Sequence, residues 1–156
     1  MKKSKFEHMV EKAFWGLEAR YGFKKTETKF ENRSVTVRFQ NATTEILLNY
    51  EIGNTPWLEI ADVHKIKNKS TLGWLLVETD VDKAPLPEQA FLPTTLKEDE
   101  LEPVLQTMGQ QLLDHGADLL KGDFAIMPKL QERARKYALE CDRYLCLLYT
   151  SDAADE

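Results

Sequence analysis

The sequence predicts a single α+β domain, because its hydrophobic period changes twice along the chain. Apolar residues recur every three or four positions near the N-terminus, every second position between 23 and 62, and every three or four positions again after 100. The first and last periods are typical of amphipathic helices, and the middle one is typical of half-buried strands. We therefore expect an N-terminal helix, an antiparallel meander of about four strands, a short helix and a C-terminal helical hairpin.

The N-terminal helix is expected from about residue 5 to residue 21. Ser4 and Glu7 have the spacing of a capping box, in which each side chain accepts a hydrogen bond from a free backbone N–H at the helix start. Gly22 can adopt the left-handed conformation that commonly ends a helix. The apolar face, which should pack on the sheet, consists of Phe6, Val10, Ala13, Phe14, Leu17 and Tyr21.

Strands are expected between 23 and 62, where apolar and polar residues alternate. The clearest apolar positions are Val35, Val37 and Phe39, followed by Ile46, Leu48 and Tyr50. The breaks at 31–33, 40–42 and 53–56 are short and rich in turn-forming residues. Short breaks favour consecutive antiparallel strands, because parallel strands need long crossover connections.

Three features of the next segment are less regular. The basic run Lys65–Lys69 is interpreted as a solvated loop. The apolar run 70–78 has a length that fits either a short helix or a strand, and Ser70 as a possible cap favours the helix. Residues 82–95 include several prolines, which exclude regular structure, so a long ordered loop or a mobile flap is expected there.

Two helices should end the domain. The first, at about 100–120, has one apolar stripe, and a bend is expected at Gly116. A stop and a new N-cap are expected at 121–123, and a last helix should then fold back to form a hairpin. The stripe of the first helix contains Leu101, Leu105, Met108, Leu112, His115 and Leu119, and that of the second contains Leu130, Ala134, Tyr137, Ala138 and Cys141.

The final segment, 146–156, resembles the translated adapter of a transposon-based sequencing library at every position. This resemblance implies a single native domain over 1–145, truncated at its C-terminus, followed by a non-native tail. The tail holds three of the 26 acidic residues, so against 21 basic residues the net charge falls from −5 to −2. Cys141 is then a lone cysteine, which cannot form an internal disulfide and indicates a reducing, cytoplasmic location.

The spacing of the reactive residues argues against several chemistries. The three histidines lie in different segments and form no recognised metal motif. Cys141 is expected on the buried side of the last helix, where a thiol is unreactive. The sequence contains no G-x-S-x-G elbow and no glycine-rich phosphate loop. We expect no catalytic residue, no metal and no cofactor, and neither nucleic acid nor membrane as a partner.

The most suggestive residues are the tryptophans Trp15, Trp57 and Trp74. Trp15 lies almost opposite the apolar face of its helix, so it is either exposed or buried by a second layer, and exposed tryptophan is enriched at binding hot spots. Trp57 and Trp74 also fit ordinary core packing. These residues favour a non-catalytic protein-binding module, with another protein or a second copy of the chain as partner.

Small bacterial α+β proteins of this general build include toxin-immunity proteins, which the chain resembles in architecture only. The resemblance implies a protein partner and assigns no individual residue. The alternative is a small-ligand-binding protein or enzyme whose pocket lies between the sheet and the loop 85–93. Its candidate residues are His64 or His115 together with a carboxylate such as Glu59 or Asp62.

Overall fold

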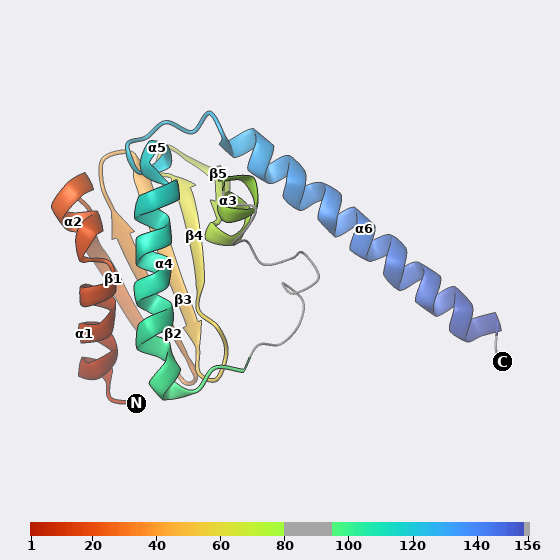
Figure 1. Ribbon diagram of the computed structural model, residues 1–156, viewed down its shortest axis with the longest axis horizontal. Coiled ribbons are helices and arrows are strands. Elements are labelled where there is room, and N and C mark those ends of the chain that lie inside the picture. The colour runs from red at the N-terminus through yellow and green to blue at the C-terminus, as the bar shows by residue number, and fades with distance from the viewer. Residues whose placement is uncertain (80–94, 155–156) are drawn as a thin grey trace.

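A computed structural model of the chain describes residues 1–79 and 95–154, with side chains described as far as Arg143. It confirms the α+β class: a single five-stranded antiparallel meander carries helices before and after it (Figure 1). The strands are β1 (Lys24–Glu31), β2 (Ser34–Gln40), β3 (Thr44–Glu51), β4 (Trp57–Asp62) and β5 (Lys65–Thr71). The helices are α1 (Lys3–Ala13), α2 (Trp15–Tyr21), α3 (Leu72–Thr79), the 3-10 helix η2 (Glu98–Glu100), α4 (Leu101–His115), α5 (Ala117–Leu120) and α6 (Met127–Ala154).

The two faces of the sheet differ because side chains alternate along each strand. One face lies against α1 and α4, which run side by side across it (Figure 1). That face buries Val35, Val37, Phe39, Ile46, Leu48, Tyr50, Leu58 and Ile60. The opposite face is polar, and there Arg38 forms an ion pair with Glu27 at 2.8 Å and another with Glu45.

The N-terminal helix is broken at Phe14, where one continuous helix was expected. Phe14 is 3% exposed, and its ring centroid lies 5.7 Å from that of Phe39, so the break turns this ring into the core. The expected capping box is wrong. The helix begins before Ser4, and the N-cap residue is Lys2, which makes no capping hydrogen bond through its side chain. Gly22 does end α2 in the left-handed conformation, with φ of 67°.

The basic run is a strand rather than a solvated loop. It forms most of β5, which pairs with β4 at one edge of the sheet. The pairing is irregular: Lys65 lies opposite Asp62, whereas the neighbouring Ala61 lies opposite Lys69. Residues 66–68 therefore bulge out of the ladder. The apolar run that follows is the expected helix, α3, which begins at Leu72. The expected serine cap is wrong: Ser70 lies in β5, and the hydroxyl of Thr71 accepts a hydrogen bond from the backbone N–H of Trp74 at 3.4 Å.

The C-terminal helices are present, and the chain does bend at Gly116, between α4 and α5. However, α6 packs on α3 and β5 instead of returning along α4 as a hairpin would (Figure 1). The amide of Gln131 donates hydrogen bonds to the carbonyls of Lys67 and Lys69, and Leu130 is fully buried. These contacts direct α6 toward the sheet edge. Most of the expected loop 82–95 falls outside the described residues.

The turn between β2 and β3 joins the sheet to two helix ends. The side-chain amide of Asn41 donates hydrogen bonds to the carbonyls of Tyr21 and Leu120, each at 3.0 Å. Its own oxygen accepts from the backbone N–H of Thr44 at 2.8 Å. Thr44 is fully buried, and its hydroxyl donates to the carbonyl of Leu119 at 2.6 Å. One turn thus satisfies carbonyls at the ends of both α2 and α5.

Helix α4 approaches the α1–α2 junction very closely, and two glycines make this possible. A Cβ atom added to Gly109 would lie 2.1 Å from the carbonyl oxygen of Ala13. One added to Gly16 would lie 2.5 Å from Cδ1 of Leu113. At Gly109 the near atom is backbone, so a larger residue there would require a helix to move. At Gly16 the near atom is the end of the Leu113 side chain, which can turn away.

Candidate functional site

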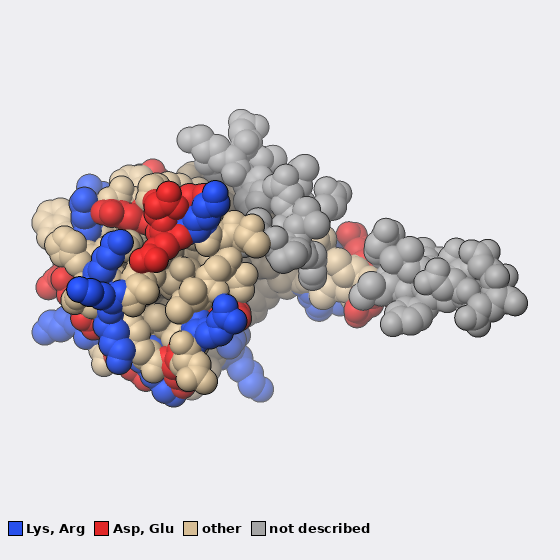
Figure 2. Space-filling view, turned by 90° about the horizontal axis from the view of Figure 1, so that it is seen from below, with Lys and Arg blue, Asp and Glu red and all other residues tan. Residues whose placement is uncertain are grey.

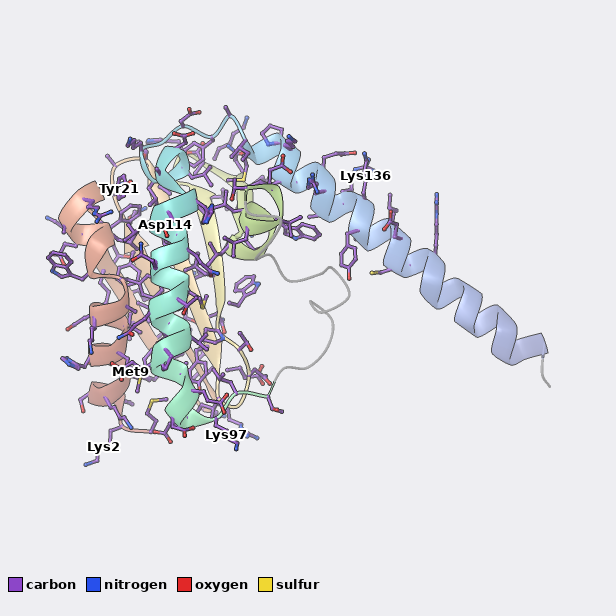
Figure 3. All side chains as sticks on the ribbon, in the orientation of Figure 1. Lys2, Met9, Tyr21, Lys97, Asp114 and Lys136 are labelled. Atoms are coloured by element: carbon purple, nitrogen blue, oxygen red, sulfur yellow. The ribbon has the colours of Figure 1, made fainter. Side chains whose placement is uncertain are left out.

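A groove of about 610 Å³ lies between α3, α4 and the start of β4. Figure 3 shows the ribbons of α3 and α4 next to each other, with the described side chains drawn as sticks. The lining residues are Thr55, Pro56, Trp57, Leu58, Thr71, Leu72, Gly73, Trp74, Leu76, Pro103, Val104, Thr107, Met108 and Gln111. We call this feature the α3–α4 groove.

The groove exists because the start of β4 extends beyond the end of β5. Thr71, the last residue of β5, lies opposite Glu59, so Trp57 and Leu58 have no β5 neighbour. The chain then crosses into α3 and leaves this part of the β4 edge uncovered. Trp57 consequently remains 46% exposed, whereas the next residue, Leu58, points to the core face of the sheet and is buried.

Trp74 forms the opposite wall and connects the groove to α6. It is half-buried and packs on the core. Its ring meets that of Tyr137 edge-on, with centroids 5.6 Å apart and planes at 66°. Such T-shaped pairs bring the positive edge of one ring to the negative face of the other. The position of Trp74 therefore depends on how α6 is anchored.

The chemistry of the α3–α4 groove is apolar. Its lining residues include none of the side chains that ionise, and its polar side-chain groups are the threonine hydroxyls, the amide of Gln111 and the indole N–H groups of Trp57 and Trp74. Proton transfer in a catalytic site generally requires His, Asp, Glu, Lys, Cys or Tyr within hydrogen-bond reach. The described lining can bind apolar groups and orient them, but it supplies no general acid or base.

An ion-pair cluster anchors α6 beside this groove. Glu78, at the end of α3, is 9% exposed and contacts both Lys129 and Arg133 of α6. The hydrogen bond from Lys129 lowers the pKa of the Glu78 carboxyl below its ordinary value of 4.5. Burial opposes this change, and the positive charge of Arg133 reinforces it. The ionised carboxylate is therefore the form that holds α6 on α3.

Replacing Glu78 with Gln should weaken the docking of α6 and lower the free energy of unfolding, because both ion pairs are lost. The loss should be only about 1 kcal/mol, because Lys129 and Arg133 are 66% and 48% exposed and solvent screens their charges. The folded-state pKa lies below the unfolded one, so the native chain has this stability above about pH 4.5 and loses it as pH falls through the folded value. Urea denaturation of both proteins at several pH values would measure the difference. If the difference in unfolding free energy between the two proteins is unchanged at pH 3, the ionised Glu78 carboxylate is not its cause.

Trp15 lies on the other side of α4. Its side chain is 68% exposed, and it lines a separate depression of about 380 Å³ with Arg20, Gln110 and Leu113 among its neighbours. Within α4, Gln110 and Leu113 face this depression, whereas Val104 and Met108 face the α3–α4 groove. The structure thus brings Trp57 and Trp74 together and leaves Trp15 apart.

The four residues of the alternative pocket do not form one site. Glu59 lies on the sheet face opposite the helices, 3.7 Å from Lys69, because its neighbours in β4 point into the core. Asp62 accepts a hydrogen bond from the backbone N–H of His64, which is an exposed turn residue. His115 lies on α4, with Nδ1 3.1 Å from the hydroxyl of Thr79. The loop that would close this pocket is outside the described residues.

Acidic residues gather at the end of the molecule where α4 begins, which Figure 2 views directly. Glu98, Asp99 and Glu100 form the turn before α4, and the sequence already places them where a helix dipole favours negative charge. Lys5 lies 3.7 Å from Glu98. Across the described residues, no group of three or more His, Cys, Asp or Glu side chains could hold a metal ion.

None of the helices in the described part of the chain is long and apolar enough to cross a membrane. The chain matches no protein-family model, no curated protein and no solved structure. The site must therefore be judged from its own geometry.

Sequence reasoning identified Trp57 and Trp74 but missed the α4 wall of the groove. Met108 was assigned to the buried stripe of its helix, whereas it lies half-buried beside the groove. The available signal was a second apolar pair, Val104 and Met108, four residues apart and offset from the buried Leu101–Leu105–Leu112 stripe. The apolar face of this helix is wider than packing on the sheet alone requires, and this width indicates a second apolar surface.

Proposed function

We propose that this protein is a non-catalytic binding module that holds an apolar segment of a partner protein in the α3–α4 groove. The observation that carries the proposal is a groove with tryptophan on two walls and no ionisable lining residue among those described. The centres of protein interfaces are depleted of charge and enriched in aromatic residues and Met. Tryptophan in particular is over-represented among the residues that dominate binding energy.

The proposed partner is another protein, and the general build of toxin-immunity proteins makes a toxin domain the first class to test. Cys141 is a lone cysteine outside 146–156, which supports a reducing compartment such as the cytoplasm. The residues that carry the proposal all lie before position 112, so it does not depend on whether 146–156 is native.

Site-specific photo-crosslinking in the cell of origin tests the proposal. A photoreactive phenylalanine analogue replaces Trp57, and the matched control carries it in place of Trp15, on the other side of α4. The proposal expects a discrete crosslinked protein from the Trp57 position, identified by mass spectrometry and then purified for binding measurements. Crosslinks that form equally from both positions, or none from Trp57, would count against the groove.

Once a partner is purified, Trp57→Ala should weaken binding by about 2 kcal/mol, roughly thirtyfold, in calorimetric titration. The folded state should lose little stability, because Trp57 is 46% exposed. Trp15→Ala is the control, since Trp15 is the more exposed residue and should leave both quantities nearly unchanged if the groove alone binds. An unchanged dissociation constant for Trp57→Ala would remove the groove from the interface.

A small apolar ligand is the second candidate, because about 610 Å³ is within the usual range for small-molecule pockets. Native mass spectrometry of the protein purified from its own cells distinguishes the two. A retained small molecule that Trp57→Ala releases would favour the ligand, and an apo mass together with a protein crosslink would favour the partner.

A further inference from the structure

The bulged part of β5 has features that pairing with β4 does not explain. Residues 66–68 leave the ladder between the Lys65–Asp62 and Lys69–Ala61 pairs. Gln131 of α6 then fixes the displaced backbone, donating to the Lys67 carbonyl at 2.9 Å and to the Lys69 carbonyl at 3.1 Å. Bulges commonly re-aim side chains at edges and near functional sites. Hydrogen bonds to Gln131 thus fix the backbone that carries the side chains of residues 66–68.

The bulge presents an apolar residue between two cations. Ile66 is 78% exposed, the highest value among the exposed large apolar side chains of the described residues. Strand β5 lies beside the start of α6 (Figure 1). There the lysines on either side of Ile66 line a depression of about 350 Å³. Its lining consists of Lys65, Lys67, Asn68, Phe124, Pro128 and Gln131, with no acidic residue among those described.

The acidic side chains of the neighbouring elements are already engaged. Asp62 accepts from the backbone N–H of His64, and Asp123 accepts from that of Ala125. Glu59 pairs with Lys69.

Glu78, the nearby acid on α3, contacts Lys129 and Arg133. Lys65 and Lys67 therefore have no carboxylate partner within the described part of the chain. Their positive charge is available to a ligand from outside the molecule.

We propose that the Lys65–Ile66–Lys67 bulge is a second interaction surface, which binds an acidic segment of a partner protein carrying an aliphatic side chain. Two free ammonium groups complement carboxylates, and Ile66 with the half-buried Phe124 complements an apolar side chain. A nucleic acid fits less well, because it requires many phosphate contacts and the chain carries a net charge of −5. This surface is distinct from the α3–α4 groove and does not depend on it.

A fluorescent peptide of alternating glutamate and leucine is the probe, and its fluorescence anisotropy is followed as full-length protein is added. The proposal expects saturable binding that weakens with added salt, and amide chemical-shift changes centred on Ile66 and Lys67 in NMR spectra. The double variant Lys65→Glu/Lys67→Glu should weaken binding at least about tenfold, since both attractive charges become repulsive. Ile66→Ser should also weaken it.

The matched control is Lys24→Glu/Lys97→Glu, which makes the same change of net charge at two other exposed lysines. Its affinity should stay within about twofold of the native protein, because solvent screens distant charges. Circular dichroism verifies that each variant is folded, and Lys65→Gln/Lys67→Gln serves if the charge reversal unfolds the chain.

Three results would overturn the proposal. One is the same affinity for a matched peptide of glutamine and leucine, and another is the same affinity in the two charge-reversal variants. The third is preferential binding of a thymidine oligonucleotide or of phosphatidylserine vesicles over the acidic peptide, which would assign the surface to a different class of partner.

Discussion

An Asn41→Asp variant should unfold with about 2–4 kcal/mol less free energy than the native chain at neutral pH. The change keeps the size of the side chain and the oxygen that accepts from the Thr44 N–H. It removes the NH2 group that donates to the carbonyls of Tyr21 and Leu120, and it places a negative charge against those two oxygens. Carbonyls deprived of a donor cost more than the net value of the lost hydrogen bonds. Urea denaturation followed by circular dichroism measures the loss.

The effect should depend on pH in a defined direction. Repulsion from the two carbonyls raises the folded-state pKa of the introduced carboxyl above its unfolded value, so the deficit is largest at neutral pH and shrinks as pH falls and the group is protonated. Asn49→Asp is the control, because Asn49 lies half-buried on the polar face of the sheet, away from the helix ends. If the two variants lose the same free energy of unfolding, the hydrogen bonds of Asn41 to the ends of α2 and α5 do not stabilise the fold.

Gly109→Ala should be the second strongly destabilising substitution, with a loss of about 2–3 kcal/mol. Alanine is the better helix former by about 1 kcal/mol, so propensity alone predicts a gain. The new methyl group would lie 2.1 Å from the carbonyl oxygen of Ala13, which is backbone and cannot rotate away. Helix α4 must therefore move off α1, and the contact around the buried Phe14 loosens.

The same exchange at Gly73 provides the comparison. Gly73 is also helical, but its nearest neighbour would be the Thr71 hydroxyl at 3.7 Å, an ordinary contact. Gly73→Ala should therefore be neutral or should stabilise the chain by up to about 1 kcal/mol. In thermal unfolding, Gly109→Ala should lower the melting temperature, whereas Gly73→Ala should leave it unchanged or raise it. A Gly109→Ala protein that melts at or above the native temperature would show that α1 and α4 are not in close contact.

The sequence was sufficient for the fold class because hydrophobic period reports which side of each element is buried. Val37 and Leu48 alternate with less buried neighbours, so the meander was predictable. β5 was missed because three of its seven residues are lysine and none of them is buried. Local signals cannot report tertiary contacts. The break at Phe14 results from packing against Phe39, and nothing in the helical period near Phe14 indicates it.

The candidate site was predictable only in part for the same reason. Composition draws attention to tryptophan. That Trp57 and Trp74 line the same groove, however, depends on the first two residues of β4 lying beyond the end of β5. Asn41 lies in the turn expected at 40–42, but its joining role was not predictable, because that role lies in bonds to helices that are remote in the sequence. The orientation of α6 likewise depends on Glu78 and Gln131, whose partners no sequence pattern identifies.

Both outer strands of the sheet are irregular and rich in lysine, and this limits how the protein can be recognised. The β1–β2 register shifts between Lys25 and Glu27, and on the other side residues 66–68 leave the β4–β5 ladder. A strand added from another molecule would have to reproduce a kink and approach charged side chains, and native sheets use both features to avoid pairing edge to edge. These edges therefore disfavour recruitment by main-chain hydrogen bonding and amyloid-like growth. Partners of this protein are therefore expected to be recognised through side-chain contacts.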